Sequence, residues 1–187
     1  KQIAGFYLPN EICAINIENI NPMQTTNNFE NILDIAKILP TWKDIEFIKN
    51  NTNLPVILKG ITSVSYAKKA VELGIDAIVV SNHAGRTLDT LPASIEILPK
   101  IVNEIKGKIP ILFDGGIKRG TDVIKAIALG ASAVMIGRPI MYGLATAGAL
   151  GVAHTLKILK EELEVSMIFT GCKNIEELKK LELTFNN

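Results

Sequence analysis

Four short runs of apolar, mostly β-branched residues recur along the chain, and each run ends in a polar residue or a glycine. Such runs lack the alternation of a half-buried strand and are typical of strands that are buried on both faces of a parallel sheet. The four predicted strands are Pro55–Gly60, Ala77–Ser81, Pro110–Asp114 and Ala133–Gly137.

Segments with helical patterning separate these strands and flank them. Three helices are predicted between the strands, at Ser65–Leu73, Pro92–Ile105 and Thr121–Leu129, and Gly74 and Gly130 follow the first and last of them as C-caps. Thr41–Asn50 is predicted as an earlier helix, with Thr41 as its N-cap and Asp44 completing an approximate capping box. Gly148–Val165 and Asn174–Lys180 are the predicted closing helices. This alternation of strands and helices predicts a parallel α/β arrangement.

Four strand–helix units are half of a TIM (β/α)8 barrel, which typically needs roughly 250 residues. The predicted fold is therefore α/β, the C-terminal half of such a barrel, with strands five to eight and their flanking helices over residues 41–187. Residues 1–40 are polar and rich in asparagine, and we expect them to form a long loop after strand four. The alternative is a self-contained α/β layer. A half-barrel leaves two strand edges unpaired, which a soluble protein has to cover.

Composition excludes several classes of function. The net charge of +1 and the scattered lysines give no basic stripe for nucleic acid. Cys13 and Cys172 lie far apart without metal-ligand spacing, so we expect reduced thiols, no metal site and a cytoplasmic protein. Residues 1–10 lack the apolar core of a signal peptide.

One stretch, from Pro139 to Leu156, has no charged residue over eighteen positions. That length is enough for a membrane-spanning helix, but the stretch contains proline, threonines, a histidine and glycines, which disfavour one. We therefore predict a buried helix in which His154 is structural, and no transmembrane segment.

The chain has only three arginines beside seventeen lysines, and all three arginines lie in glycine-bearing clusters. A guanidinium is a planar, always-charged, bidentate donor that suits carboxylates and phosphates. Arg86, Arg119 and Arg138 are therefore the first candidates for an anion-binding site.

The same clusters follow the predicted strands, where a barrel of this kind places its chemistry. They are Lys59, Ser81 to Arg86, Asp114 to Gly120, and Gly137 with Arg138. The last two are typical of a phosphate cradle, because glycines let backbone N–H groups approach an anion and Gly120 opens a helix whose dipole favours it. The alternative is that the glycines only form tight turns and the arginines are surface charges.

Several motifs resemble one family closely. They are Lys59-Gly60, Ser-Asn-His-Ala-Gly-Arg at 81–86 with Leu88-Asp89, Asp-Gly-Gly-Ile-Lys-Arg-Gly-Thr-Asp-Val at 114–123, and Ile-Gly-Arg-Pro at 136–139. These motifs are similar to those of the FMN-dependent α-hydroxy acid oxidases and dehydrogenases, the family of glycolate oxidase, lactate oxidase and L-lactate dehydrogenase. The resemblance runs from about residue 41 to the end of the chain.

The resemblance implies oxidation of an L-2-hydroxy acid to the 2-oxo acid. It implies His83 as the catalytic general base, which also binds substrate, and Arg86 as the clamp of the substrate carboxylate. It further implies FMN, with Lys59 facing flavin N1 and O2, Ser81 at the isoalloxazine edge and Asp114 on the ribityl hydroxyls. The implied phosphate ligands are Gly115, Gly116, Arg119, Gly137 and Arg138.

The sequence departs from the family at Ala84, where the family normally has glycine, and the family's catalytic tyrosine and aspartate belong to the other half of the barrel. The expected partners are therefore a 2-hydroxy acid, an N-terminal half of the barrel and further copies in a homo-oligomer, with no nucleic acid. Two alternatives stay open: another FMN- or phosphate-binding barrel such as a type 2 isopentenyl-diphosphate isomerase relative, or an inactive remnant that only binds phosphate or a partner half. The electron acceptor, whether oxygen, a quinone or a cytochrome, also stays open.

Overall fold

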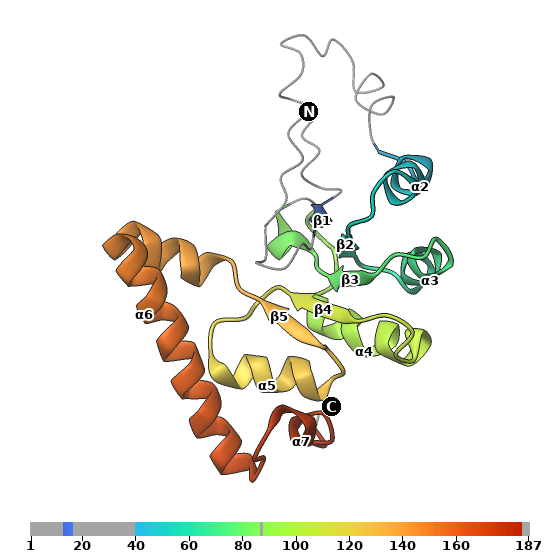
Figure 1. Ribbon diagram of the computed structural model, residues 1–187. Helices are drawn as coiled ribbons and strands as arrows, with labels where there is room; N and C mark the ends of the chain where they lie inside the picture. Colours follow the sequence, from blue (N-terminus) through green and yellow to red (C-terminus); the bar gives the residue numbers. More distant parts are fainter. Residues whose placement is uncertain (1–12, 17–39, 87, 185–187) are drawn as a thin grey trace.

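A computed structural model of the chain describes residues 13–16, 40–86 and 88–184. Its five strands form one sheet in the order β1-β2-β3-β4-β5, and all four neighbouring pairs are parallel. The strands are β1 (Cys13–Asn16), β2 (Val56–Ile61), β3 (Ala77–Val80), β4 (Ile111–Asp114) and β5 (Ala133–Met135). Since all the strands are parallel, their carboxyl ends lie along one edge of the sheet (Figure 1).

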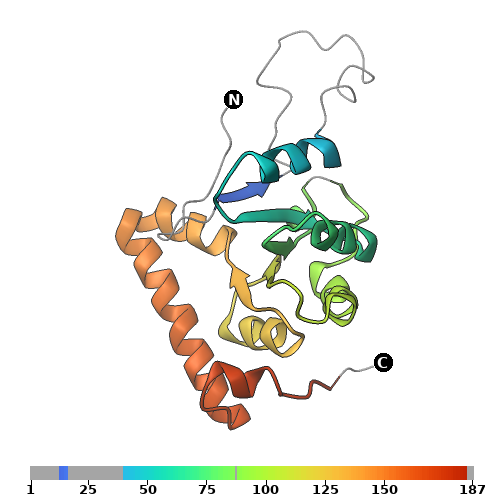
Figure 2. The same cartoon turned by 45° about the vertical axis from the view of Figure 1, so that its right-hand side comes forward.

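Five of the six described α-helices lie within two residues of their predicted bounds, but the helix predicted at Gly148–Val165 begins ten residues earlier, at Arg138, and ends five residues later, at Thr170. The helices are α2 (Trp42–Asn50), α3 (Val64–Glu72), α4 (Ser94–Ile105), α5 (Gly120–Ala128), α6 (Arg138–Thr170) and α7 (Ile175–Leu178), with a short 3-10 turn η3 (His83–Gly85). Thr41 is the N-cap of α2, and Asp44 completes the predicted capping box. Figure 2 shows α3, α4 and α5 following one another along one side of the row of strands. The predicted parallel α/β arrangement is confirmed.

The main core fills the space between the sheet and these helices. Its centre is formed by fully buried side chains of β2, β3, β4 and α4, such as Leu58, Ile78, Phe113 and Leu98. A second, smaller cluster lies apart from this core and comes from alternate strand positions: Ile57, Ala77 and Val79, with Leu112 and Met135 packed against them. Because successive strand residues point to opposite faces, these five side chains line the other face of the sheet. Both faces of the central strands are thus apolar, as the uninterrupted runs predict.

One strand lies inside the segment that we expected to be a loop. Cys13–Asn16 forms β1 and pairs with β2 in the register Asn16 to Lys59. The run is only four residues long and stands in polar, asparagine-rich sequence, so nothing in its composition distinguishes it from a loop. The rest of residues 1–40 lies outside the described residues except for Pro40.

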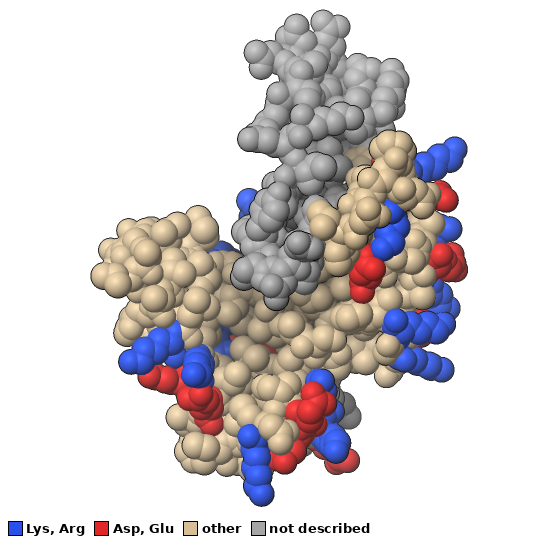
Figure 3. All heavy atoms as spheres, in the orientation of Figure 1, with Lys and Arg blue, Asp and Glu red and all other residues tan. Residues whose placement is uncertain are grey.

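Helix α6 differs from the buried helix that the uncharged stretch predicts. The helical segment begins at Arg138 and is interrupted at Ala147 and Gly148, which have non-helical backbone angles. Much of its apolar surface is exposed, with Leu150 80% and Phe169 86% accessible. Figure 3 shows the first part of α6 as a lobe almost without charged side chains. The prediction of burial is wrong for the described residues, because only one flank of α6 meets α5 and nothing among those residues covers the other flank.

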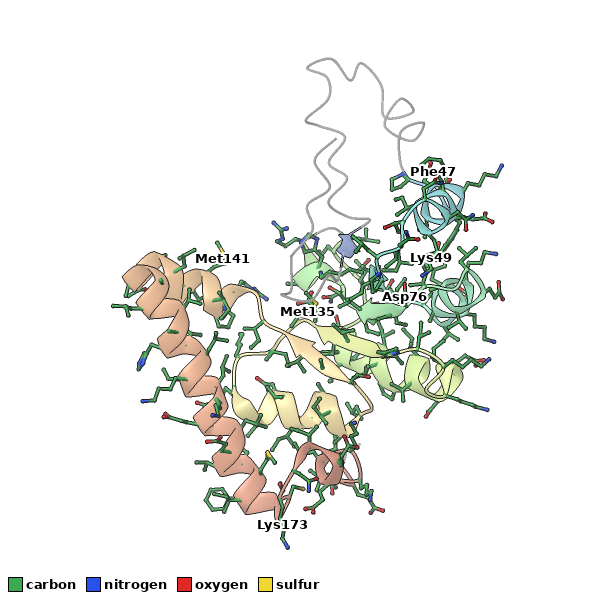
Figure 4. All side chains as sticks on the ribbon, in the orientation of Figure 1. Phe47, Lys49, Asp76, Met135, Met141 and Lys173 are labelled. Carbon is green, nitrogen blue, oxygen red and sulfur yellow. The ribbon has the colours of Figure 1, made fainter. Side chains whose placement is uncertain are left out.

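The interruption lets α6 fold back on itself. A methyl group at Gly143 would lie 2.5 Å from Thr155 Oγ1 and 2.7 Å from Gly151 O, so the two arms approach too closely for a side chain. His154 lines the groove between the arms together with Tyr142 and Thr146. Met141 lies on the first arm and is largely exposed (Figure 4). Among the helices that the structure describes, none is long and apolar enough to cross a membrane.

A carboxylate ties the start of β2 to α2. Asp76 Oδ2 accepts hydrogen bonds from Lys49 Nζ and from the backbone N–H of the buried Val56, each at 2.6 Å (Figure 4). Desolvation is the largest single influence on the pKa of Asp76 and raises it, but the hydrogen bonds from Lys49 and Val56, together with the charge of Lys49 and the backbone N–H of Asp76, lower the pKa below its usual value.

We predict that Asp76→Ala lowers the free energy of unfolding by roughly 1–3 kcal/mol, since it leaves a buried backbone donor without its acceptor. Because the folded-state pKa of Asp76 is lowered, its contribution is present above the unfolded value near 3.8 and is lost as the pH falls through the folded value. Urea unfolding at pH 7 and at pH 3 measures both effects. Glu72→Ala, which removes only the exposed pair with Lys69, is the control. Equal stabilities of the two variants at pH 7 would contradict the assignment.

Candidate active site

Three of the predicted site residues meet at the ends of three neighbouring strands. Lys59 Nζ lies 2.9 Å from Asp114 Oδ2 and 3.2 Å from Ser81 Oγ, and Ser81 Oγ donates to Asp114 Oδ2 at 2.6 Å. The side chains of Lys59 and Asp114 are only 12% and 19% exposed. The structure therefore brings together residues that come from β2, from the end of β3 and from β4.

Ser81 is the centre of this network and is fully buried. Its hydroxyl donates to Asp114 and accepts from Lys59 Nζ and from the backbone N–H of His83 at 3.1 Å. A hydroxyl has one hydrogen to donate and two lone pairs, so all its hydrogen-bonding capacity is used. In this arrangement Ser81 holds its neighbours in place. Lys59 keeps its third ammonium proton, and Asp114 keeps its second oxygen, for a bound molecule.

A β-bulge directs Lys59 toward the network. The register between β2 and β3 shifts between Lys59 and Ile61, and the intervening Gly60 has a φ of 95°. Only glycine adopts such an angle without strain. The bulge bends the strand at its end, which is a common way of aiming a side chain beside an active site.

The loop after β3 is fixed by a second buried hydroxyl. Ser94, at the start of α4, accepts from the backbone N–H of Asn82 at 3.0 Å, and Asn82 Nδ2 donates to Pro92 O at 3.2 Å. Gly115 lies against the same hydroxyl, and a Cβ at Gly115 would be 2.9 Å from Ser94 Oγ. Neither Asn82 nor Ser94 was predicted as a site residue. The signal was weak: Ser94 is a polar residue at the start of a predicted helix, as many helix-capping serines are.

His83 and Arg86 lie on one turn. Arg86 Nη2 is 2.6 Å from His83 Nε2. A guanidinium can only donate, so Nε2 is the acceptor in this contact and carries the lone pair, while the proton of the neutral ring lies on Nδ1. In this structure the imidazole lone pair is engaged by the guanidinium, so a basic nitrogen and a planar cation lie side by side.

The backbone of this turn is left-handed over three successive residues. The φ angles are 52° at His83, 56° at Ala84 and 74° at Gly85. Left-handed backbone is costly for residues with a Cβ, so Ala84, which stands where the family normally has glycine, is strained. No heavy atom lies within 4 Å of the position that a Cβ would take at Gly85, so an alanine there would be strained by its backbone angle and not by crowding.

We predict that Ala84→Gly raises the free energy of unfolding by up to about 1 kcal/mol, because glycine adopts positive φ without a steric penalty. The matched variant is Gly85→Ala, which adds the same methyl at a φ of 74° and should destabilise by a similar amount. Thermal unfolding of the two variants and of the unmodified protein shows whether each substitution stabilises or destabilises the fold. Destabilisation by Ala84→Gly would show that the turn is not strained at this position.

The predicted phosphate ligands fall into two groups. Gly115 and Gly116 follow β4 with φ of 122° and 78°, which glycine alone tolerates. The register pairs Asp114 with Met135, so these glycines lie beside the chain that leads to Gly137. Gly137 is the N-cap of α6 and Arg138 its first residue. Arg138 is exposed and has no ion-pair partner among the described residues.

Arg119, the remaining predicted phosphate ligand, pairs with a carboxylate on α6. Its guanidinium donates to Glu162 on α6, from Nη2 at 3.2 Å and from Nε at 3.5 Å, and the backbone N–H of Gly120 donates to the same carboxylate at 2.9 Å. The N–H of Gly120 lowers the pKa of Glu162, and Arg119 lowers it further. The expected anion of this helix start is thus already present as a side chain, and the phosphate role of Arg119 stays a prediction.

No cluster of metal-ligating side chains occurs in the part of the chain that the structure describes. The parallel sheet with its covering helices is that of a partial β/α barrel, and the candidate site residues gather at the carboxyl ends of its strands. The chain belongs to the FMN-dependent dehydrogenase family, whose model matches residues 8–184. This confirms the resemblance seen in the motifs.

The relatives have related activities in their names. The chain is 50% identical over 147 residues to the peroxisomal (S)-2-hydroxyacid oxidase GLO3 of Arabidopsis thaliana, covering 79% of this chain and 40% of the relative. It is 50% identical over 138 residues to an L-lactate oxidase of a Nostoc species, covering 74% of this chain and 38% of the relative. The chain therefore spans about 40% of the length of the first of these curated relatives.

Solved structures agree on the fold. Mandelate oxidase with benzoyl-formic acid superposes with a TM-score of 0.75 at 47% identity, covering 76% of this chain and 43% of that protein. A mandelate oxidase variant with (S)-mandelic acid gives a TM-score of 0.77 at 45% identity, covering 79% and 44%. The predicted partial barrel is thereby confirmed. The cytoplasmic location stays a prediction, since relatives include peroxisomal proteins.

FMN is the cofactor of this family, and the site residues fit it. Gly115 and Gly116 have no side chain to keep a phosphate from their backbone, and the Lys59–Ser81–Asp114 network offers a cation and a carboxylate oxygen at the same edge.

Proposed function

We propose that the protein carrying this chain oxidises an (S)-2-hydroxy acid to the 2-oxo acid with FMN. One observation carries the proposal: the His83–Arg86 pair is joined to the Lys59–Ser81–Asp114 network, through the hydrogen bond from His83 N to Ser81 Oγ at 3.1 Å. A proton acceptor and a carboxylate ligand therefore stand beside the residues that fit the cofactor.

In this proposal Arg86 binds the substrate carboxylate with its planar fork, which orients the α-carbon toward His83. When the guanidinium turns from His83 to the substrate carboxylate, the lone pair at His83 Nε2 is released and takes the proton. Bound FMN supplies the acceptor of two electrons.

The remaining proposed roles concern the cofactor. Lys59 places its positive charge near flavin N1 and O2, Ser81 keeps Lys59 and Asp114 aligned at the isoalloxazine edge, and Asp114 accepts from the ribityl hydroxyls. The proposed phosphate ligands are backbone groups of Gly115, Gly116 and Gly137 with the side chain of Arg138; the predicted contribution of Arg119 competes with its pairing to Glu162.

Two other functions were left open by the sequence. A phosphate-binding barrel of the isopentenyl-diphosphate isomerase type needs no carboxylate clamp, so the placement of Arg86 against His83 favours the oxidase. A protein that binds without turnover is the second alternative, and it is separated from an oxidase by the kinetics of the two site variants below.

We predict that Arg86→Lys weakens binding of substrate and of the 2-oxo acid by roughly 1–3 kcal/mol, since an ammonium cannot reproduce the bidentate contact. His83→Ala should abolish flavin reduction and leave FMN bound. Stopped-flow flavin absorbance and titration with a 2-oxo acid measure the two effects in the FMN-loaded protein. Equal and mild changes in both variants would assign the pair a structural role.

The unpaired edges of the sheet support the proposal that an N-terminal half of the barrel completes the fold. Among the described residues β1 and β5 each pair on one side only, and the apolar flank of α6 is exposed. Such edges and faces favour association. We propose that an N-terminal set of strands covers them and closes the barrel.

We predict that the chain alone is unstable or self-associates, and that mixing it with a separately made N-terminal half of a relative yields a soluble complex. The complex should bind FMN in preference to FAD and oxidise (S)-2-hydroxy acids. Size-exclusion chromatography with flavin absorbance checks this. A compact, stable monomer that gains no flavin on mixing would contradict the prediction and favour a self-contained domain.

A further inference from the structure

Glu162 makes a contact that the proposed reaction does not use. It lies on α6, and its carboxylate receives three hydrogen bonds from the first residues of α5: two from the Arg119 guanidinium and one from the backbone N–H of Gly120. Its side chain is 30% exposed, less than half as much as that of Arg119 at 71%.

The packing around the contact is close. A Cβ at Gly120 would collide with the α6 backbone at Glu162 and Leu163. Gly120 itself is buried. The start of α5 is therefore seated directly on the backbone of α6, and the Glu162 carboxylate is fixed at this point by sterics as well as by hydrogen bonds.

The loop before α5 is tied down from the inside as well. Asp122 Oδ2 accepts from the backbone N–H groups of Lys118 and Arg119, each at 3.0 Å. Together Asp122 and Glu162 occupy the backbone donors of three successive residues. The carboxylates thus satisfy backbone donors at the positive end of α5.

We propose that Glu162 is a positioning residue for the phosphate-binding loop, and that Arg119 binds Glu162 instead of the phosphate. We call the contacts of Glu162 with Arg119 and Gly120 the Glu162 clamp. This clamp fixes the backbone of residues 118–120, and the fixed backbone holds Gly115 and Gly116 at the cofactor edge. The inference rests on the proposed function for what the loop binds, but the clamp itself is a property of α5 and α6.

The experiment is a double-mutant cycle in the protein form that binds FMN. The variants are Glu162→Gln, Arg119→Gln and the two combined. Each single variant should weaken FMN binding by roughly tenfold, about 1.4 kcal/mol, and the double variant should be no weaker than either single one, because each removes the same contact. Quenching of flavin fluorescence gives the dissociation constants.

Riboflavin, which lacks the phosphate, separates positioning from general loosening. The clamp predicts that the ratio of FMN to riboflavin dissociation constants rises in the variants, whereas a merely structural effect would weaken both ligands alike. Glu161→Gln is the matched control, since Glu161 pairs only with Lys157 one turn away on the same helix, at 3.6 Å. A direct phosphate role for Arg119 predicts the opposite pattern: a loss with Arg119→Gln and unchanged or tighter FMN binding with Glu162→Gln. That pattern would overturn the proposal.

Thermal unfolding of the flavin-free protein tests the clamp without reference to the cofactor. Glu162→Gln and Arg119→Gln should lower the midpoint by a similar amount, roughly 2–4 °C, and not additively. Since the pKa of Glu162 is lowered by Gly120 N–H and then by Arg119, the difference from the unmodified protein should be present above about pH 4.5 and shrink as the pH falls through the folded value.

The FMN-binding experiment and the unfolding experiment test the two proposals separately. Absence of FMN binding in the unmodified protein would refute the proposed function and leave the unfolding result to decide on the clamp. Unfolding midpoints of Glu162→Gln equal to those of Glu161→Gln would refute the clamp even in a protein that binds FMN.

Discussion

The ion pair between Lys59 and Asp114 is the interaction on which the site depends. It joins β2 to β4 across the end of β3, and both charges are more than four-fifths buried. Charges in such a place are tolerated only when they are paired and hydrogen-bonded. Ser81 meets that condition by bonding to both, and its remaining lone pair accepts the backbone N–H of His83. The position of His83, the candidate general base, therefore depends on the ion pair between Lys59 and Asp114 through their shared partner Ser81.

The fold was predictable to the extent that it is local. The four apolar runs place β2 to β5 within two residues, because a strand buried on both faces needs an uninterrupted apolar run, and parallel strands end at one edge. Strand β1 carries no such signal. Its four residues owe their conformation to pairing with β2, which is a long-range contact that composition does not report.

The site was predictable as a set of residue types but not as a set of pairs. Lysine, serine, aspartate and the histidine–arginine turn follow from their positions after strands. The partner of Arg119 does not, because Glu162 is 43 residues away and nothing in either local sequence links the two. A lone arginine in a glycine-bearing loop fits a phosphate and a carboxylate equally well, since each presents two acceptor oxygens to the planar guanidinium fork. Only the position of α6 separates them.

Helix α6 shows the limit of hydropathy most clearly. Eighteen uncharged residues correctly indicate a surface that is unfavourable in water, but they do not say which element covers it. In the described structure one flank of α6 meets α5 through Gly120, and the exposed flank carries side chains such as Leu150 and Ile168. The contacts that build the cofactor edge span neighbouring strand–helix units and are present within this chain. The contacts that would bury α6 need a partner for its second flank. The candidate site and the burial of α6 therefore depend on different parts of a barrel.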